Sequence, residues 1–139
     1  MSKVLIDTNI VIDLLAKREP FYKSAARLFS MADKQTLELS ISSLTFANTS
    51  YVLTRLRSTQ EAREILRRFR VLVKVLPLTD KIIDLALNDS NFTDFEDGLQ
   101  YYSAIENEQD VIITRDLKDF KVSKIPAMTA DEYLISLEQ

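Results

Sequence analysis

The segment VLIDTNIVIDLL, residues 4–15, contains the junction on which the fold prediction rests. Residues 4–6 are consecutive apolar residues, a pattern typical of a short strand that is buried on both faces. From Thr8 to about Lys17 the apolar residues follow helical spacing. Asp7 stands between the two patterns, so the segment predicts a strand, an acidic turn and a helix in immediate succession.

The same alternation of strand and helix patterns continues along the chain. Further strands are expected at residues 37–41, 71–76 and 111–114, with a short one near residues 127 and 128. Helices are expected at residues 21–32, 43–55, 59–70 with Thr59 as its cap, 79–87, 94–107 and 130–137. We therefore predict an α/β fold, a three-layer α/β/α sandwich with a short, mainly parallel sheet of four or five strands. Residues 1–139 are expected to form a single domain.

The composition excludes several classes of chemistry. The chain has no His and no Cys, which excludes serine-hydrolase triads, His- or thiolate-ligated metals and thiol nucleophiles. Its single Gly excludes the usual glycine-rich nucleotide-binding loops. The net charge of −3 argues against nucleic-acid binding by bulk charge and leaves a local basic patch open.

The N-terminal apolar run is interrupted by Asp7 and Asn9, unlike the core of a signal peptide. No segment approaches the roughly 18 apolar residues that a membrane helix needs. We therefore expect a cytoplasmic protein with no membrane segment.

Acidic residues follow two of the predicted strands. Asp7 comes just after residues 4–6, and Asp116 comes just after residues 111–114. Functional groups of parallel sheets collect beyond the carboxyl ends of the strands. Hard oxygen ligands on rigid elements bind Mg²⁺ or Mn²⁺, which polarises a phosphoryl oxygen and lowers the pKa of bound water. Simpler readings stay open, because Asp7 also suits a helix cap and Asp116 a turn.

A third acidic group opens the predicted helix at residues 94–107. Asp94, Glu96 and Asp97 all fall in its first turn. They can extend a metal site, or they can be the ordinary negative complement of the helix dipole.

Four segments in order, LIDTNIVIDLL, ISSLTFANTSYVL, FEDGLQYYSA and VIITRDLKDF, resemble the PIN domain, and the likeness runs from Val4 to the closing IPAMTADEYL. PIN domains are metal-dependent nucleases, and many are toxins of bacterial and archaeal toxin–antitoxin pairs (VapC-like). The resemblance implies a Mg²⁺- or Mn²⁺-dependent endoribonuclease that cleaves RNA. It also implies a type II toxin with a cognate antitoxin protein, and a homodimer.

The resemblance further implies a set of site residues. Asp7, Asp97 and Asp116 match the acids that act in catalysis and hold the metal. Thr8, Asn9 and Thr114 would support the site, as substrate-binding residues, by hydrogen bonds to ligands or phosphate.

One position departs from the family pattern. The second acid of the family, usually Glu, is matched here by Asn48 within LTFANTSY, and Asn48 is kept in the catalytic set as a variant position. An amide oxygen accepts from water or ligates a metal weakly, but it cannot act as a base. Asp94, Glu96 or Asp119 are candidates to restore the missing charge.

Other readings of the chain remain open. Asn48 favours a catalytically weakened PIN-like module that binds nucleic acid or regulates, and a phosphatase-like domain is less favoured because no DxD follows residues 4–6. A basic cluster suits either phosphate binding or a solvated helix face: Arg55, Arg57, Arg63, Arg67, Arg68 and Arg70. Phe46, Tyr51 and Leu53 suit the core or an interface, and Tyr101 and Tyr102 suit core packing with hydrogen-bonded hydroxyls.

Overall fold

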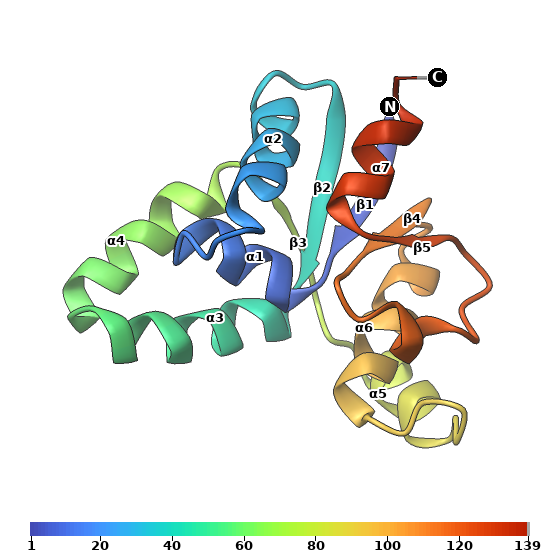
Figure 1. Ribbon diagram of the computed structural model, residues 1–139. Coiled ribbons are helices and arrows are strands. Elements are labelled where there is room, and N and C mark those ends of the chain that lie inside the picture. The colour runs from blue at the N-terminus through green and yellow to red at the C-terminus, as the bar shows by residue number, and fades with distance from the viewer. Residues whose placement is uncertain (139) are drawn as a thin grey trace.

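The computed structural model describes residues 1–138 and contains one five-stranded sheet in the order β3-β2-β1-β4-β5 (Figure 1). The strands are β1 (Ser2–Ile6), β2 (Leu37–Ser42), β3 (Lys74–Leu76), β4 (Val111–Ile113) and β5 (Ala127–Met128). Every neighbouring pair in the sheet is parallel. The predicted α/β fold is therefore confirmed, with the higher of the two strand numbers.

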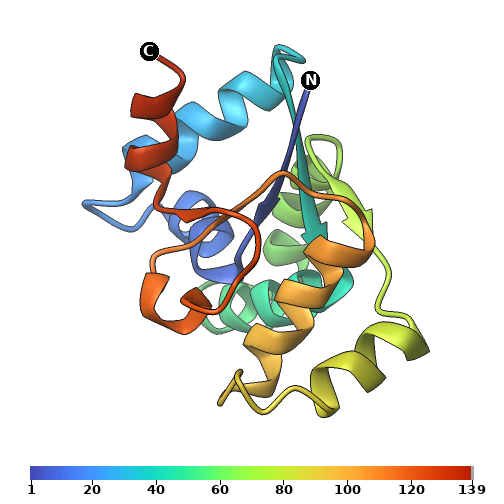
Figure 2. The same ribbon diagram turned by 90° about the vertical axis from the view of Figure 1, so that its right-hand side faces the viewer.

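Helices cover both faces of this sheet (Figures 1 and 2). They are α1 (Thr8–Leu15), α2 (Tyr22–Asp33), α3 (Ser43–Leu56), α4 (Thr59–Arg70), α5 (Asp80–Leu87), α6 (Phe95–Glu106) and α7 (Ala130–Ser136), with a short 3-10 helix η1 (Leu117–Phe120). Among the described residues, no helix is both long enough and apolar enough to cross a membrane.

The alternation of side chains along β1 divides the core into two layers. Val4 and Ile6 pack with α1, α2, α4 and α7 on one face, where Leu28 is fully buried. Leu5 points to the other face and packs with α6 and η1, and α5 covers α6 from outside. Burying one such Leu or Ile side chain stabilises a fold by about 1.5–3 kcal/mol.

The order of the strands creates a crevice at the carboxyl ends of β1 and β4. The chain runs outward from β1 through β2 to β3, and then returns to add β4 and β5 on the opposite side of β1. In the register of the central pair, Ile6 lies beside Ile113. Open parallel sheets bind their ligands at such a reversal of strand order. The residues that follow Ile6 and Ile113 therefore meet there.

Two local predictions differ from the structure, and one short helix was not predicted. The cap of α4 is Ser58, whose Oγ accepts from the backbone N–H of Glu61 at 3.1 Å, and Thr59 is the first helical residue instead of the cap. Strand β3 starts at Lys74 and not at Val71, because residues 71–73 continue from α4 as a turn. Helix η1 was not predicted, since four residues carry no periodic pattern.

Candidate acidic metal site

Asp7 lies at the junction of β1 and α1 and is almost completely buried, with 7% of its surface exposed. Its backbone N–H donates to the carbonyl of Ile113 at 2.9 Å, which continues the β1–β4 pairing by one residue. Its Oδ1 accepts from the backbone N–H of Thr8 at 2.8 Å and caps α1. The expected capping role is therefore confirmed, and the second carboxylate oxygen, Oδ2, takes part in a separate set of contacts.

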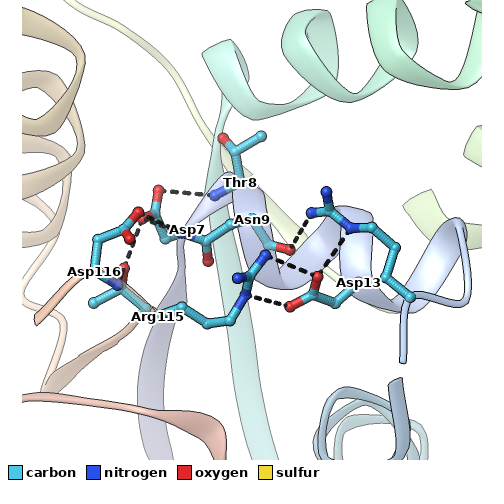
Figure 3. A network of polar contacts seen from close by, with 8 residues as sticks. Asp7, Thr8, Asn9, Asp13, Arg115 and Asp116 are labelled. Atoms are coloured by element: carbon cyan, nitrogen blue, oxygen red, sulfur yellow. Dashed lines mark hydrogen bonds and ion pairs between the residues drawn. The ribbon is translucent and has the colours of Figure 1, made fainter. Parts of the chain in front are cut away.

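Thr114 connects Asp7 to Asp116. The fully buried Thr114 hydroxyl donates to Oδ2 of Asp7 at 2.8 Å and accepts from the backbone N–H of Asp116 at 3.0 Å. The side-chain N–H₂ of Asn9 also joins the two acids, donating to Oδ2 of Asp116 at 3.0 Å and to Oδ2 of Asp7 at 3.3 Å (Figure 3). Thr114 and Asn9 therefore donate hydrogen bonds to the acidic side chains. Hydrogen bonds from these residues to a phosphate stay a prediction.

Helix α6 brings a second group of polar residues to the crevice. Asp94 is its N-cap and accepts from the backbone N–H of Glu96 at 2.8 Å, while Asp97 lies in the first turn. One turn further, the side-chain N–H₂ of Gln100 donates to Oδ1 of Asp7 at 3.3 Å and to the hydroxyl of Thr45 at 3.1 Å. Helix α6 is thereby fastened to the end of β1.

A cavity of about 300 Å³ brings most of the expected site residues together. We call it the acidic cavity; it is lined by Asp7, Thr8, Asn9, Ile12, Arg18, Asn48, Asp94, Glu96, Asp97, Gln100, Asp116 and Asp119. Thr114 lies behind this wall, and none of the six clustered arginines from Arg55 to Arg70 is among the residues that line it. Asn48 is thus on the cavity wall, and Arg18 is the single cationic side chain that lines it within residues 1–138.

Burial and neighbouring acids raise the pKa of two carboxyl groups of the acidic cavity, Asp97 and Asp7. The pKa of Asp97 is raised to about 7, chiefly because burial disfavours its charged form, and further because Asp94, Asp7, Asp119 and Asp116 repel that charge. Burial also raises the pKa of Asp7, against the opposing hydrogen bonds from Thr114 and Thr8. A bound cation would relieve both effects.

The chemistry of the donors fits a hard divalent cation. Carboxylate and amide oxygens are the ligands that Mg²⁺ and Mn²⁺ prefer, and the amide oxygens of Asn9 and Gln100 are buried without a hydrogen-bond partner in the described part of the chain. Within residues 1–138, however, no three acidic side chains are already arranged to hold one ion. The amide N–H₂ of Asn9 lies between Asp7 and Asp116 instead, so it would have to give way to a metal.

Sequence reasoning missed a charged network beneath the site. The fully buried Asp13 on α1 accepts two hydrogen bonds from Arg115, at 2.9 and 3.2 Å, and one from Arg18 at 3.1 Å (Figure 3). Arg115 directly precedes Asp116, so this network fixes the turn that carries Asp116. The only signal of this network in the sequence is a charged residue, Asp13, among the apolar residues of a predicted helix.

The residues with open alternatives divide between core and surface. Leu53 is buried and Phe46 packs partly into the core, whereas Tyr51 is 63% exposed. The prediction for the two tyrosines of α6 is confirmed: Tyr101 is buried and its hydroxyl accepts from the N–H of Lys124, and the Tyr102 hydroxyl donates to Asp89.

Three of the six arginines of the basic cluster form ion pairs with neighbouring glutamates. Glu64 pairs with both Arg67 and Arg68, and Glu61 pairs with Arg57. These contacts agree with the reading of a solvated helix face.

Comparison with known proteins identifies the family. The model of the PIN domain matches residues 3–118, and the chain belongs to the PIN domain family. It is similar to ribonuclease VapC1 of Aquifex aeolicus (strain VF5), with 27% identity over 136 residues that cover 95% of this chain and 93% of that relative.

Solved structures share the fold. VapBC-1 from nontypeable Haemophilus influenzae is similar with a TM-score of 0.71 and 18% identity, covering 93% of this chain and 98% of that one. A toxin–antitoxin complex from Klebsiella pneumoniae is similar with a TM-score of 0.65 and 23% identity, covering 91% of this chain and 97% of that one.

Proposed function

We propose that this chain is a Mg²⁺- or Mn²⁺-dependent endoribonuclease in which Asp7, Asp97 and Asp116 hold the metal. The observation that carries the proposal is the meeting of these three acids, from three distant parts of the sequence, in one cavity at the switch point of the sheet. Membership of the PIN domain family supports the nuclease class. The similarity to a protein named ribonuclease VapC1 supports RNA as the substrate.

Each residue of the acidic cavity has a separate task in this proposal. The divalent cation, when bound, supplies Lewis-acid stabilisation of the charge that develops on the phosphodiester. Thr114 and Gln100 hold the carboxylate of Asp7 in one orientation through their hydrogen bonds of 2.8 and 3.3 Å. Thr8 and Asn9 lie on the wall of the cavity, and the Asn9 amide would be free to donate to a phosphate oxygen once a cation takes its place between Asp7 and Asp116.

The first experiment measures RNA cleavage with and without Mn²⁺ for the wild type and for Asp7→Asn. We expect the variant to lose about 100-fold or more in rate while remaining folded, because a lost ligand removes several kcal/mol of transition-state stabilisation. The matched control is Asp84→Asn, which removes an acid of α5 that does not line the acidic cavity. Unchanged cleavage by Asp7→Asn would refute the proposed site.

Calorimetric titration with Mn²⁺ tests the metal separately from the reaction. Asp97→Asn should abolish or greatly weaken the binding seen with wild type, and Asp84→Asn should retain it. If the wild type does not bind Mn²⁺ at millimolar concentration, the carboxylates act only as helix caps and surface charges and not as a metal site.

A second candidate function is a catalytically weakened module that binds RNA without cleaving it. Asn48 favours it, since this half-buried residue adds an uncharged amide to the wall of the acidic cavity where the family usually has an acid. This function predicts RNA retention without turnover in Mn²⁺. Asn48→Glu should then strengthen Mn²⁺ binding and raise cleavage, whereas the control Asn48→Gln should not. Asp94, Glu96 and Asp119 also line the acidic cavity. If one of them already supplies the missing negative charge, the charge that Asn48→Glu adds is unnecessary.

We also propose that the chain is the toxin of a type II toxin–antitoxin pair and forms a homodimer. The fold shared with a toxin–antitoxin complex supports the first part, and exposed apolar side chains such as Tyr51, Leu56 and Val71 support protein contacts. RNA as substrate and an antitoxin as partner imply action in the cytoplasm. Light scattering on the isolated chain and co-purification with a neighbouring small protein test the dimer and the pair, respectively.

A further inference from the structure

A second cavity, of about 380 Å³, adjoins the acidic cavity and shares Asp116 with it. We call it the side cavity; the residues that line it include Phe21, Ala25, Arg115, Ala130 and Asp131. Its volume falls at the lower end of the range of pockets that enclose a small ligand. Asp116 belongs to both cavities. An RNA strand with a phosphate at the acidic cavity can therefore place a neighbouring base in the side cavity.

One wall of the side cavity is a flat, rigid platform. The guanidinium of Arg115 lies 4.0 Å from the centroid of the Phe21 ring. This guanidinium donates two hydrogen bonds to buried Asp13, and they fix its plane. Phe21 is 41% exposed. Unpaired bases stack on aromatic rings and on arginine planes, so this wall suits a planar base.

The lining of the side cavity also includes a carboxylate and two small apolar side chains. Asp131, at the start of α7, is exposed and accepts a hydrogen bond from the Ser24 hydroxyl. The small apolar side chains are those of Ala25 and Ala130, which are buried. Guanine is the RNA base that presents two neighbouring N–H donors on its Watson–Crick edge, and a carboxylate accepts both of them at once.

We propose that the side cavity is a nucleobase subsite that takes an unpaired guanine of the substrate RNA. The guanine stacks on the Phe21–Arg115 pair and directs its Watson–Crick edge toward Asp131. This inference rests on the proposed function for the identity of the substrate as RNA. It adds a specificity determinant outside the acidic cavity.

The test titrates the four nucleoside monophosphates GMP, AMP, CMP and UMP into metal-free protein by calorimetry. We expect GMP to bind most tightly. Phe21→Ala should weaken GMP binding about tenfold or more, as expected for the loss of one stacked base. Phe21→Leu keeps the apolar cover over Arg115 and should weaken binding similarly. The matched control is Phe95→Ala, since Phe95 is 42% exposed and does not line the side cavity.

A second variant tests the choice of base. Asp131→Asn should bring the affinity for GMP down to that for AMP and leave the affinities for CMP and UMP unchanged, whereas Asp84→Asn should keep the preference. Equal affinity of the wild type for all four nucleotides overturns the guanine assignment. Binding that is insensitive to both Phe21 variants overturns the subsite itself. Binding of N-acetylarginine amide in place of the nucleotides also overturns it, and assigns the side cavity to a peptide partner.

These titrations need neither metal nor cleavage, so their outcome is separable from that of the proposed function. Nucleotide binding with no RNA cleavage would refute the proposed nuclease and keep the guanine subsite. Metal-dependent cleavage with no dependence on Phe21 or Asp131 would keep the nuclease and refute the subsite.

Discussion

Removing the charge of Asp97 should stabilise the metal-free protein. The folded state raises the pKa of this carboxyl from 3.8 to about 7, through burial and then through repulsion from four neighbouring acids. A shift of about 3 units corresponds to about 4 kcal/mol at 1.36 kcal/mol per unit. Asp97 is only half-buried, so solvent screening reduces this figure, and Asn also loses a helix-dipole interaction of 0.3–1 kcal/mol. We therefore expect a net gain of about 1 kcal/mol for Asp97→Asn at pH 8.

The gain should depend on pH with a defined sign. Below the unfolded-state pKa, Asp97 is protonated in both states and costs nothing. As the pH rises from about 4 to about 7, Asp97 ionises in the unfolded chain but stays largely protonated in the folded protein. The free energy of unfolding of the wild type therefore falls relative to that of the variant. The advantage of Asp97→Asn is thus small at pH 4.5 and complete above pH 7.

Urea unfolding in EDTA at pH 4.5 and pH 8 measures this difference. With a slope near 2 kcal/mol/M, a gain of 1 kcal/mol raises the midpoint by about 0.5 M. The matched control is Asp80→Asn, because Asp80 also lies in the first turn of a helix, α5, and does not line the acidic cavity. The control should lose a few tenths of a kcal/mol from the helix dipole alone. If Asp97→Asn follows the control at pH 8, the carboxylates do not repel one another as argued. Saturating Mn²⁺ should reverse the order, since it stabilises only the protein that binds it.

Three further variants test separate parts of the structure. Asp13→Asn should lower the free energy of unfolding by about 2–3 kcal/mol in urea titrations, because it leaves two arginines without their buried partner; a loss below 0.5 kcal/mol would contradict the importance of this network. Thr114→Val removes the 2.8 Å hydrogen bond to Asp7 and should weaken Mn²⁺ binding about tenfold by calorimetry, whereas Thr114→Ser should not; equal affinities would argue against the orienting role. Leu28→Ala, in the core between α2 and the sheet, should cost about 2–5 kcal/mol of stability and leave the cleavage rate at 20 °C unchanged; a slower reaction by the folded variant would link core packing to the site.

The order of strands and helices could be predicted because buried parallel strands are short runs of apolar residues. That same criterion failed at residues 71–73, where the apolar run VLV looks like a strand but forms a turn, with Val71 84% exposed and Val73 buried. The cap of α4 was misplaced by one residue because Ser58 and Thr59 are both good caps and only the backbone angles distinguish them.

The site was predictable to the extent that strand ends dictate it. Asp7 and Asp116 meet because the β1–β4 register brings Ile6 beside Ile113, and the topological rule anticipates that meeting. Gln100 and Asp13 were not found, because their roles depend on contacts between elements and not on a local pattern. The catalytic, metal-binding and substrate-binding roles of all the expected site residues stay predictions that only the metal and cleavage experiments test.

The hydrogen bond between Thr114 and Asp7 spans 107 positions of the sequence. Asp7 is made early during translation and its supporting hydroxyl comes late, so a growing chain cannot assemble the acidic pair until β4 and the turn after it have left the ribosome. Contacts of such long range also form slowly, because their loop must close before they contribute. If the proposed function holds, an incomplete chain that is still attached to the ribosome therefore cannot cleave the RNA being translated.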